Sequence, residues 1–366
     1  MVSAKKPKII AIVGARPQFL KAAPLSAELR KVAAEVVIHT GQHYSPHLSE
    51  VFFKQLSIPR PRYNLDVGSG THAEQTGQMM IGIEKILVKE RPQLVLLYGD
   101  TNSTLAGALA AIKLHLPIAH VEAGMRSFDI SMPEENNRIV TDRVSSLLFC
   151  ASPTAVKNLR AEGITNHVYL VGDNMLDILF ANLDRAQMHS RILRRLKLRP
   201  KRFLLITLHR ASNTDSLGNL LAIAAALERI AEPMVFPMHP RMETALKVNG
   251  LLEQLQRIPS LQIVKPVGYL DMIKLMTDAR LILTDSGGVQ KEAFSLKVPC
   301  VTLRHTTEWV ETVELGWNRL VGANTKKILQ AVKTMRTPRR HRFVYGHGQA
   351  SKRIARSIIK YLRKRT

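Results

Sequence analysis

The stretch Lys8–Val13 reads KIIAIV and runs directly into Gly14-Ala15-Arg16-Pro17. A short, nearly continuous apolar run is typical of a strand buried on both faces of a parallel sheet. Glycine permits a tight turn after the strand, and proline suits the first turn of a helix. The N-terminal segment therefore predicts a strand, a turn and a helix, which is the first half of a βαβ unit.

The same alternation continues along the chain in two series. Ala- and Leu-rich helical stretches such as Thr104–Leu114 separate short β-rich runs, and alternation of this kind predicts parallel sheets with right-handed crossovers. We expect an α/β protein with two Rossmann-like, doubly wound domains facing a cleft. The other predicted strands are Glu35–His39, Gln93–Leu97, Ile118–Val121 and Leu147–Cys150 in the first series, and Phe203–Thr207, Met234–Pro237, Gln262–Val264, Arg280–Thr284 and Cys300–Leu303 in the second.

The two series give the expected domain boundaries. We expect an N-terminal domain over residues 1–172 and a C-terminal domain over residues 173–350, with a C-terminal helix, residues 351–366, that packs back on the first domain. An alternative for this last stretch is a basic amphipathic helix on a membrane surface. Both interpretations rest on one apolar helical face opposite Lys and Arg, formed by Ile354, Ile358, Ile359 and Leu362.

Composition narrows the class of protein. The chain has 366 residues, 45% of them hydrophobic, so it can bury sizeable cores. Its two cysteines, Cys150 and Cys300, lie in no CxxC or Cys/His cluster, which argues against a disulfide framework and a zinc finger. No apolar run approaches the roughly 18 residues of a membrane span, and no signal peptide is apparent. We expect a soluble cytoplasmic protein.

The charge is strongly positive and concentrated near the C-terminus. The formal net charge is +24, and fifteen Lys and Arg residues follow Glu314 with no acidic residue among them. Such a balance attracts polyanions, so a nucleic-acid or membrane-surface binding protein is the alternative of another class. Against nucleic acid, no recognition motif occurs and only 5% of the residues are aromatic. We expect no nucleic-acid partner.

Two turns have the features of phosphate sites. After the first strand, Arg16 and Lys21 lie at a helix start whose N–H groups would be free to bind an anion. A tight turn with two solvated cations explains the same residues equally well. No GxGxxG or GxxxxGK[ST] motif occurs, which disfavours dinucleotide and ATP sites.

The second turn follows the strand that ends at Thr284. Its Ser286-Gly287-Gly288 sequence lets a phosphate approach the backbone, and Glu292 lies one turn into the next helix, where it could bind a ribose. Two such turns, one in each predicted domain, indicate a single pyrophosphate-bearing ligand bound outside the carboxyl ends of the strands.

Acidic and histidine side chains follow several other predicted strands. Asp100 and Glu122 each come directly after a buried strand, whereas Glu134 opens a helix, where acids are favoured in any case. His209 and His239 each end a strand beside an arginine. No HxH, HExxH or DxD spacing occurs, so we expect neither a metal nor another cofactor.

Taken together, these segments resemble the non-hydrolysing UDP-N-acetylglucosamine 2-epimerases, which have the GT-B fold. The resemblance runs from about Ile10 to Gly322, and it is the order of the motifs that makes it specific. The motifs are GARPQFLKAAPL, HTGQHY, GDTNSTLAGALAA, HVEAGMRS with PEENNR, TLHRASN, TDSGGVQKEA and LRHTTEW.

The resemblance implies roles for particular residues. Asp100, Glu122, Glu134 and His209 would take part in the chemistry, with UDP eliminated to leave a 2-acetamidoglucal and then re-added. The family is often dimeric, which implies a homodimer. The residues that would hold the UDP moiety are Arg16, Lys21, His209, Ser286, Gly287, Gly288 and Glu292.

Three departures from the usual family motifs point to a second substrate. The first turn has Ala15 and Gln18, an acid is replaced by Lys291, and an arginine of the TERPE motif is replaced by Trp309. These variants resemble the branch that acts on UDP-2,3-diacetamido-2,3-dideoxy-glucuronate in surface-polysaccharide pathways. UDP-N-acetylglucosamine is the expected substrate, and the diacetamido sugar is the alternative.

Overall fold

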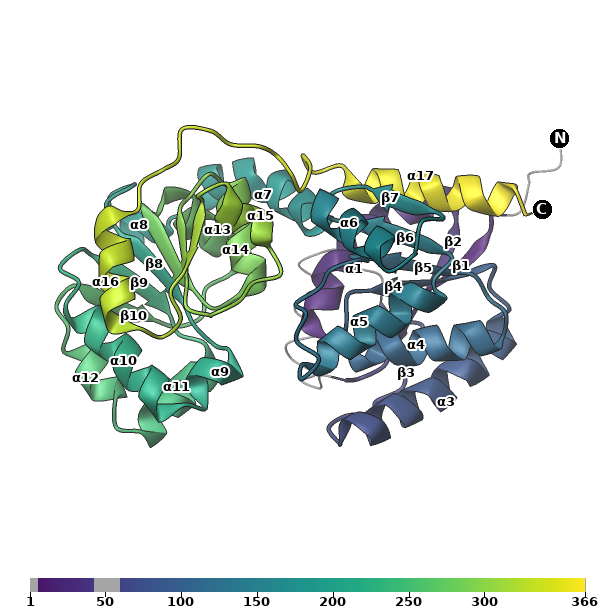
Figure 1. The fold of residues 1–366 in the computed structure, drawn as a ribbon, viewed down its shortest axis with the longest axis horizontal. Coiled ribbons are helices and arrows are strands. Elements are labelled where there is room, and N and C mark those ends of the chain that lie inside the picture. The colour runs from purple at the N-terminus through teal and green to yellow at the C-terminus, as the bar shows by residue number, and fades with distance from the viewer. Residues whose placement is uncertain (1–5, 43–59, 366) are drawn as a thin grey trace. The chain divides into compact units, whose positions relative to one another are not determined.

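The computed structural model describes residues 6–42 and 60–365, and the chain forms two compact units (Figure 1). Unit 1 comprises Met1–Ile178 and Val344–Thr366, and unit 2 comprises Leu179–Phe343. Each unit has its own parallel sheet covered by helices, so the expected α/β class with two Rossmann-like parts is confirmed.

The sheet of unit 1 has seven parallel strands among the described residues, in the order β3-β2-β1-β4-β5-β6-β7. All five strands predicted for this half are present, with ends within one residue of the predicted ones. The two edge strands β3 and β7 were not predicted, because runs of two and three residues give no periodic signal. The strands are β1 Lys8–Val13, β2 Ala34–His39, β3 Tyr63–Asn64, β4 Leu94–Tyr98, β5 Ile118–Val121, β6 Leu147–Cys150 and β7 Val168–Leu170.

The strand order in unit 1 reverses between β1 and β4, its two central neighbours. Ligands of open α/β sheets bind at the carboxyl ends of the strands beside such a reversal. The loops that follow β1, β4 and β5 therefore carry the candidate site of this unit. The helices are α1 Arg16–Val32, α3 His72–Glu90, α4 Asn102–Lys113, α5 Pro133–Val144, α6 Pro153–Ala161, α17 Ala350–Arg363 and the start of α7 Met175–His189.

Unit 2 repeats this plan with six parallel strands in the order β10-β9-β8-β11-β12-β13, reversing between β8 and β11. Its strands are β8 Leu204–Thr207, β9 Met234–Pro237, β10 Leu261–Val264, β11 Leu281–Thr284, β12 Cys300–Thr302 and β13 Asn318–Leu320. Its helices are α8 Ile192–Arg195, α9 Ala211–Thr214, α10 Leu217–Glu228, α11 Pro240–Val248, α12 Leu252–Gln256, α13 Tyr269–Asp278, α14 Gly287–Ser295, α15 Val310–Glu314 and α16 Thr325–Thr334.

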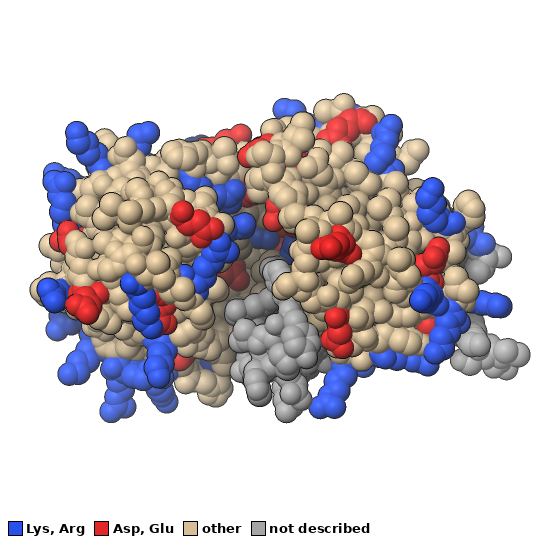
Figure 2. All heavy atoms as spheres, turned by 90° about the horizontal axis from the view of Figure 1, so that it is seen from below, with Lys and Arg blue, Asp and Glu red and all other residues tan. Residues whose placement is uncertain are grey.

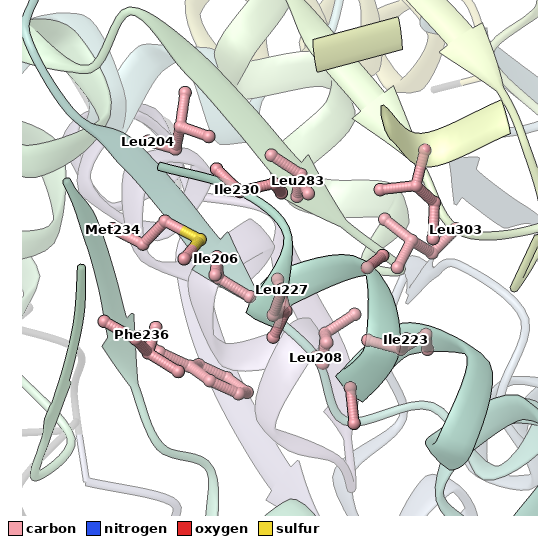
Figure 3. Close-up of a cluster of buried hydrophobic side chains, with 14 of the residues drawn as sticks. Leu204, Ile206, Leu208, Ile223, Leu227, Ile230, Met234, Phe236, Leu283 and Leu303 are labelled. Carbon is pink, nitrogen blue, oxygen red and sulfur yellow. The ribbon is translucent and has the colours of Figure 1, made fainter. Parts of the chain in front are cut away.

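A core of buried aliphatic and aromatic side chains fixes the central strands of unit 2 (Figure 3). Ile206 of β8 and Leu283 of β11 are fully buried and belong to the same cluster as Leu227 of α10. Burial of side chains of this size contributes about 1.5–3 kcal/mol each. The core thereby holds the carboxyl ends of β8 and β11, which carry the candidate residues of this unit.

The C-terminal helix α17 packs against α1 in unit 1. Ile354, Ile358 and Leu362 of its apolar face are buried, and the carboxylate of Asp177 accepts hydrogen bonds from the first amides of the helix, those of Ala350 and Ser351, at 3.0 and 2.7 Å. An acidic group at a helix N-terminus is stabilising. The apolar face of α17 is thus part of a core.

Truncation of Ile358 to alanine is expected to destabilise unit 1 by about 2–5 kcal/mol, the usual cost of emptying a fully buried aliphatic site. Chemical denaturation followed by circular dichroism would measure the change. Arg356→Ala, on the exposed face of the same helix, is the matched control and is expected to change the free energy of unfolding by less than about 0.5 kcal/mol. Equal stabilities of the two variants would contradict the role of α17 in the core.

The surface carries the positive charge that the composition indicated. Figure 2 shows Lys and Arg side chains projecting around the edges of the face drawn. Among the described residues, no helix combines the length and the apolarity that a membrane crossing requires.

Candidate active site

Two carboxylates lie at the carboxyl edge of the unit 1 sheet. Asp100 follows β4 and Glu122 follows β5, and these strands are parallel neighbours in which Tyr98 pairs with Val121. The side chain of Asp100 is 33% exposed and that of Glu122 is 14% exposed, so both remain partly accessible. The sequence placed both residues at this edge.

Asp100 is held by an arginine that sequence reasoning missed. The guanidinium of Arg138, from α5, forms an ion pair with Asp100 through one nitrogen and donates to Glu135 through the other at 2.7 Å. Asn137 of the same helix donates to the backbone carbonyl of Asp100 at 2.9 Å. Helix α5 therefore fixes both the side chain and the backbone of Asp100.

The two adjacent acids at the start of α5 have different environments. Glu135 is 1% exposed and accepts hydrogen bonds from the amide and hydroxyl of Ser127 and from the amide of Phe128, at 2.8–2.9 Å. It therefore anchors the loop before α5. Glu134, the residue predicted to take part in the chemistry, is half-buried in the first helical turn.

Lys21 and Glu122 form an ion pair in which both side chains are largely buried. The sequence had assigned Lys21 to an anion site at the start of α1, whereas within unit 1 its ammonium faces a carboxylate. Glu122 adopts a left-handed backbone conformation with φ +72°, which costs a non-glycine residue free energy and persists only where surrounding contacts impose it. The surrounding contacts thus hold Glu122, and with it the ion pair to Lys21, in a fixed conformation of the loop after β5.

Two backbone amides of the turn after β1, immediately before α1, have partners within the turn. The side-chain oxygen of Gln18 accepts from the amides of Gly14 and Ala15, at 2.7 and 3.0 Å, so these two N–H groups are already used within the turn. The side-chain nitrogen Nε2 of Gln18 donates to the backbone carbonyl of Tyr98, which ties the β1 turn to the end of β4. The side chain of Arg16 lies outside the described part of the chain.

In unit 2, a fully buried carboxylate organises the ends of β8 and β11. Asp285 accepts hydrogen bonds from the backbone amides of His209 and Arg210 and from the side-chain amide of Asn213, at 3.0–3.2 Å. The Nδ1 atom of His209 lies 3.7 Å from the same carboxylate, and its ring is partly exposed. Asp285 thus fixes the loop that presents His209.

The predicted phosphate turn opens helix α14. Ser286 occupies the N-cap position, and its side chain accepts no capping hydrogen bond. Gly287 is buried, and a side-chain carbon at this position would lie 3.3 Å from the Nε1 atom of Trp309. Gly288 follows it in the first turn, and Glu292 is 9% exposed one turn later. A helix start of this kind favours an anionic ligand.

The two unusual residues of unit 2 contact each other. The ammonium of Lys291 lies 4.0 Å from the centre of the Trp309 ring, and both side chains are buried. Cation–π contacts of desolvated groups contribute about 2 kcal/mol. The lysine and the tryptophan that depart from the usual family motifs are therefore in direct contact beside the α14 turn.

The two histidines at strand ends are brought together. The rings of His209 and His239 have centroids 5.1 Å apart. His239 caps α11, since its Nδ1 atom accepts from the amide of Arg241, whose side chain pairs with Asp215 at 2.7 Å. The Nδ1 atom of His209 faces the carboxylate of Asp285, and that of His239 caps α11.

Other chemistries find little support in the described parts of the two units. No group of three or more His, Cys, Asp or Glu side chains there is arranged to hold a metal ion. Cys150 and Cys300 are buried free thiols, and burial raises the pKa of each to about 12, far from the value a nucleophilic thiolate needs.

Two Rossmann-like units, one with two carboxylates at its sheet edge and one with a glycine-rich helix start, define an α/β protein with the GT-B fold. Residues 27–359 match the family described as UDP-N-acetylglucosamine 2-epimerase. The chain belongs to this family and is a UDP-sugar 2-epimerase, an isomerase, as the motifs had indicated.

Known relatives cover nearly the whole chain. A "UDP-N-acetylglucosamine 2-epimerase homolog" of Methanococcus maripaludis is 51% identical over 95% of this chain and 98% of its own. The UDP-2,3-diacetamido-2,3-dideoxy-D-glucuronate 2-epimerase of Pseudomonas aeruginosa is 47% identical over 96% and 99%. The crystal structure of Methanocaldococcus jannaschii UDP-GlcNAc 2-epimerase with UDP-GlcNAc and UDP matches at a TM-score of 0.88, with 45% identity over 97% and 99% of the two chains.

Proposed function

We propose that this protein is a non-hydrolysing UDP-N-acetylglucosamine 2-epimerase that interconverts UDP-N-acetylglucosamine and UDP-N-acetylmannosamine. The observation that carries the proposal is the pair of carboxylates, Asp100 and Glu122, at adjacent strand ends of unit 1. Inversion at C2 requires removal of a proton from one face of the sugar and its return to the other, and two fixed carboxylates can share these steps.

The reaction balances without an added cofactor. A base removes the C2 proton, the electron pair forms the C1–C2 double bond, and the C1–O bond breaks in an anti elimination that releases UDP. The 2-acetamidoglucal then takes UDP back at C1, and C2 receives a proton on the opposite face. Asp100 and Glu122, with Glu134 nearby in the chain at the start of α5, are the proposed proton acceptors and donors.

Unit 2 is proposed to bind the UDP moiety. The start of α14, with Ser286, Gly287 and Gly288, would accept the diphosphate, and Glu292 would accept hydrogen bonds from the ribose. His209 would stabilise the charge that develops on the departing diphosphate. We also assign Arg16 and Lys21 to UDP binding and expect a cytoplasmic homodimer without a nucleic-acid partner.

The test is incubation with UDP-N-acetylglucosamine in D₂O, without NAD or metal, followed by proton NMR of the sugar. A UDP-N-acetylmannosamine signal with deuterium at C2 would support the proposal. Retention of the starting sugar with its C2 proton, in a folded protein that binds UDP, would overturn this choice of substrate.

The contact between Lys291 and Trp309 favours a second candidate substrate, UDP-2,3-diacetamido-2,3-dideoxy-glucuronate. A buried cation beside the diphosphate turn adds positive potential there, and the uronate carries a carboxylate that the neutral N-acetylglucosamine lacks. The relative from Pseudomonas aeruginosa, named for this sugar, is about as similar to the chain as the M. jannaschii enzyme.

The double variant Lys291→Glu with Trp309→Arg is expected to lower kcat/KM for the uronate by about 10-fold relative to UDP-N-acetylglucosamine, since it places a carboxylate where an ammonium lay. Competition between the two sugars in one reaction measures the ratio directly. Lys297→Glu, an exposed charge reversal just beyond the same helix, is the control. An unchanged ratio in the double variant would remove the argument for the uronate.

A further inference from the structure

A fully buried histidine, His120, lies on β5, two residues before Glu122. The Nδ1 atom of His120 lies 2.7 Å from a carboxylate oxygen of Asp142, which belongs to α5. Its Nε2 atom lies 2.7 Å from the backbone carbonyl of Gly99, the residue immediately before Asp100. Neither His120 nor Asp142 is more than 1% exposed.

Both ring nitrogens of His120 have a hydrogen-bond partner. A backbone carbonyl can only accept, so Nε2 of His120 carries a hydrogen. The other oxygen of Asp142 accepts from the amide of Gly124 at 3.0 Å and from the guanidinium of Arg126 at 2.8 Å. Burial alone raises the pKa of the Asp142 carboxyl, but hydrogen bonds and charges from His120 and Arg126 outweigh it and leave that pKa below its usual value. Asp142 therefore joins His120, Gly124 and Arg126 through its two oxygens.

The result is a chain of hydrogen-bonded polar side chains inside unit 1. His120 bonds to Asp142, Asp142 pairs with Arg126, and Arg126 makes two hydrogen bonds of 2.7 Å to Glu162. Buried ion pairs contribute little net stability compared with well-packed apolar side chains, because each charge loses its hydration. What distinguishes these linked side chains is the set of backbone groups to which they are hydrogen-bonded.

Those backbone groups belong to the two loops that present the carboxylates. His120 holds the carbonyl of Gly99 next to Asp100, and Asp142 holds the amide of Gly124 two residues after Glu122. Gly99, Glu122 and Gly124 all have positive φ, at +62°, +72° and +77°. A non-glycine residue such as Glu122 keeps that conformation only when its surroundings enforce it.

We propose that the His120–Asp142 pair is a positioning element that sets the Asp100 and Glu122 loops for proton transfer at C2. The proposal rests on the proposed function, in which these two carboxylates perform the acid–base chemistry. His120 and Asp142 act through the backbone of the loops, so they are positioning residues.

The kinetic test uses three variants of the full chain. Asp142→Asn and His120→Asn are expected to lower kcat by about 10- to 100-fold, the range that a displacement of about 1 Å in an active site produces, with the dissociation constant of UDP changed less than 3-fold. His120→Gln keeps a donor where Nε2 lies, so it is expected to recover at least 5-fold of the kcat lost in His120→Asn. Glutamine no better than asparagine, or loss of UDP affinity in step with kcat, would overturn the positioning role.

Glu90→Gln is the matched control for loss of a buried charge. Glu90 is 6% exposed and pairs with Lys8 at the start of β1, which is the opposite edge of the same sheet. It is expected to lower the stability of unit 1 while kcat stays within 2-fold of the wild type. If kcat fell as much in Glu90→Gln as in Asp142→Asn, the fall in both variants would reflect a general loss of stability, and the positioning role would be contradicted.

Hydrogen exchange separates this proposal from the proposed function. In Asp142→Asn the amide of Gly124 faces a weaker acceptor, so the peptide over residues 120–128 is expected to exchange at least 10-fold faster, with peptides of unit 2 unchanged. This result would stand even if the wild type epimerised neither UDP-sugar. Unchanged exchange in an active protein would overturn the positioning role alone.

Discussion

Replacement of Glu122 by glutamine is expected to lower kcat for epimerisation by about 10²- to 10⁴-fold, the usual contribution of a general acid or base. The glutamine amide has nearly the same shape as the carboxylate but cannot accept the proton from C2 of the sugar. The replacement also removes the carboxylate that pairs with the ammonium of Lys21, a side chain that is largely buried. The rate of sugar inversion and the rate of deuterium uptake at C2 should both be measured, since inversion needs proton-transfer groups on both faces of C2, whereas uptake with retention of configuration needs a group on one face only.

Glu135→Gln distinguishes a loss of chemistry from a loss of structure. Glu135 is buried and accepts three hydrogen bonds from Ser127 and Phe128, so this variant is expected to lose about 1–3 kcal/mol of stability. Glu122→Gln leaves a largely buried ammonium without its carboxylate and is expected to lose stability as well, so kcat of both variants is compared under conditions in which both are folded. If Glu122→Gln retained more than a tenth of the wild-type kcat, Glu122 would not be a proton-transfer group.

The strands show which parts of the fold the sequence could predict. Runs such as Lys8–Val13 are buried on both faces, so nearly every residue is apolar and the signal is strong. The edge strands β3, β7 and β13 have only two or three residues, some of them exposed. Their pairing is imposed by the neighbouring strand, which no local pattern reveals.

Some residues of the candidate site could likewise be predicted from the sequence, and others could not. Asp100 and Glu122 directly follow buried strands, so their place at the sheet edge could be predicted. Arg138 and Asp142 lie inside α5, and their partners Asp100 and His120 come from other segments. A signal was present: with Glu135 they form one polar helical face, while Ile139 and Val140 are 37% and 38% exposed. A helix that buries its charges and exposes aliphatic residues indicates a buried ion network.

Asp285 was missed for another reason. It stands next to Ser286 in the quoted motif, yet its partners His209, Arg210 and Asn213 precede it by more than 70 residues. The contact exists because β8 and β11 are parallel neighbours that end at the same level, with Thr207 paired to Thr284. Only the strand order, which the sequence did not supply, brings these groups together.

Replacement of Asp285 by asparagine is therefore expected to weaken UDP binding by at least about 100-fold. The carboxylate accepts from three donors, and an asparagine would present a donor of its own to part of this set, which leaves buried N–H groups without an acceptor at about 1–3 kcal/mol each. The loop that presents His209 would then lose its fixed conformation. Calorimetric titration with UDP measures the effect without requiring turnover.

The matched control is Asp215→Asn in the same unit. Asp215 pairs with Arg241 at the surface, and its side chain is 62% exposed, so removal of its charge is expected to change UDP affinity by less than 3-fold. Thermal unfolding of both variants shows whether Asp285→Asn is folded at the titration temperature. A folded Asp285→Asn that binds UDP as tightly as the wild type would mean that the β8 loop contributes nothing to UDP recognition.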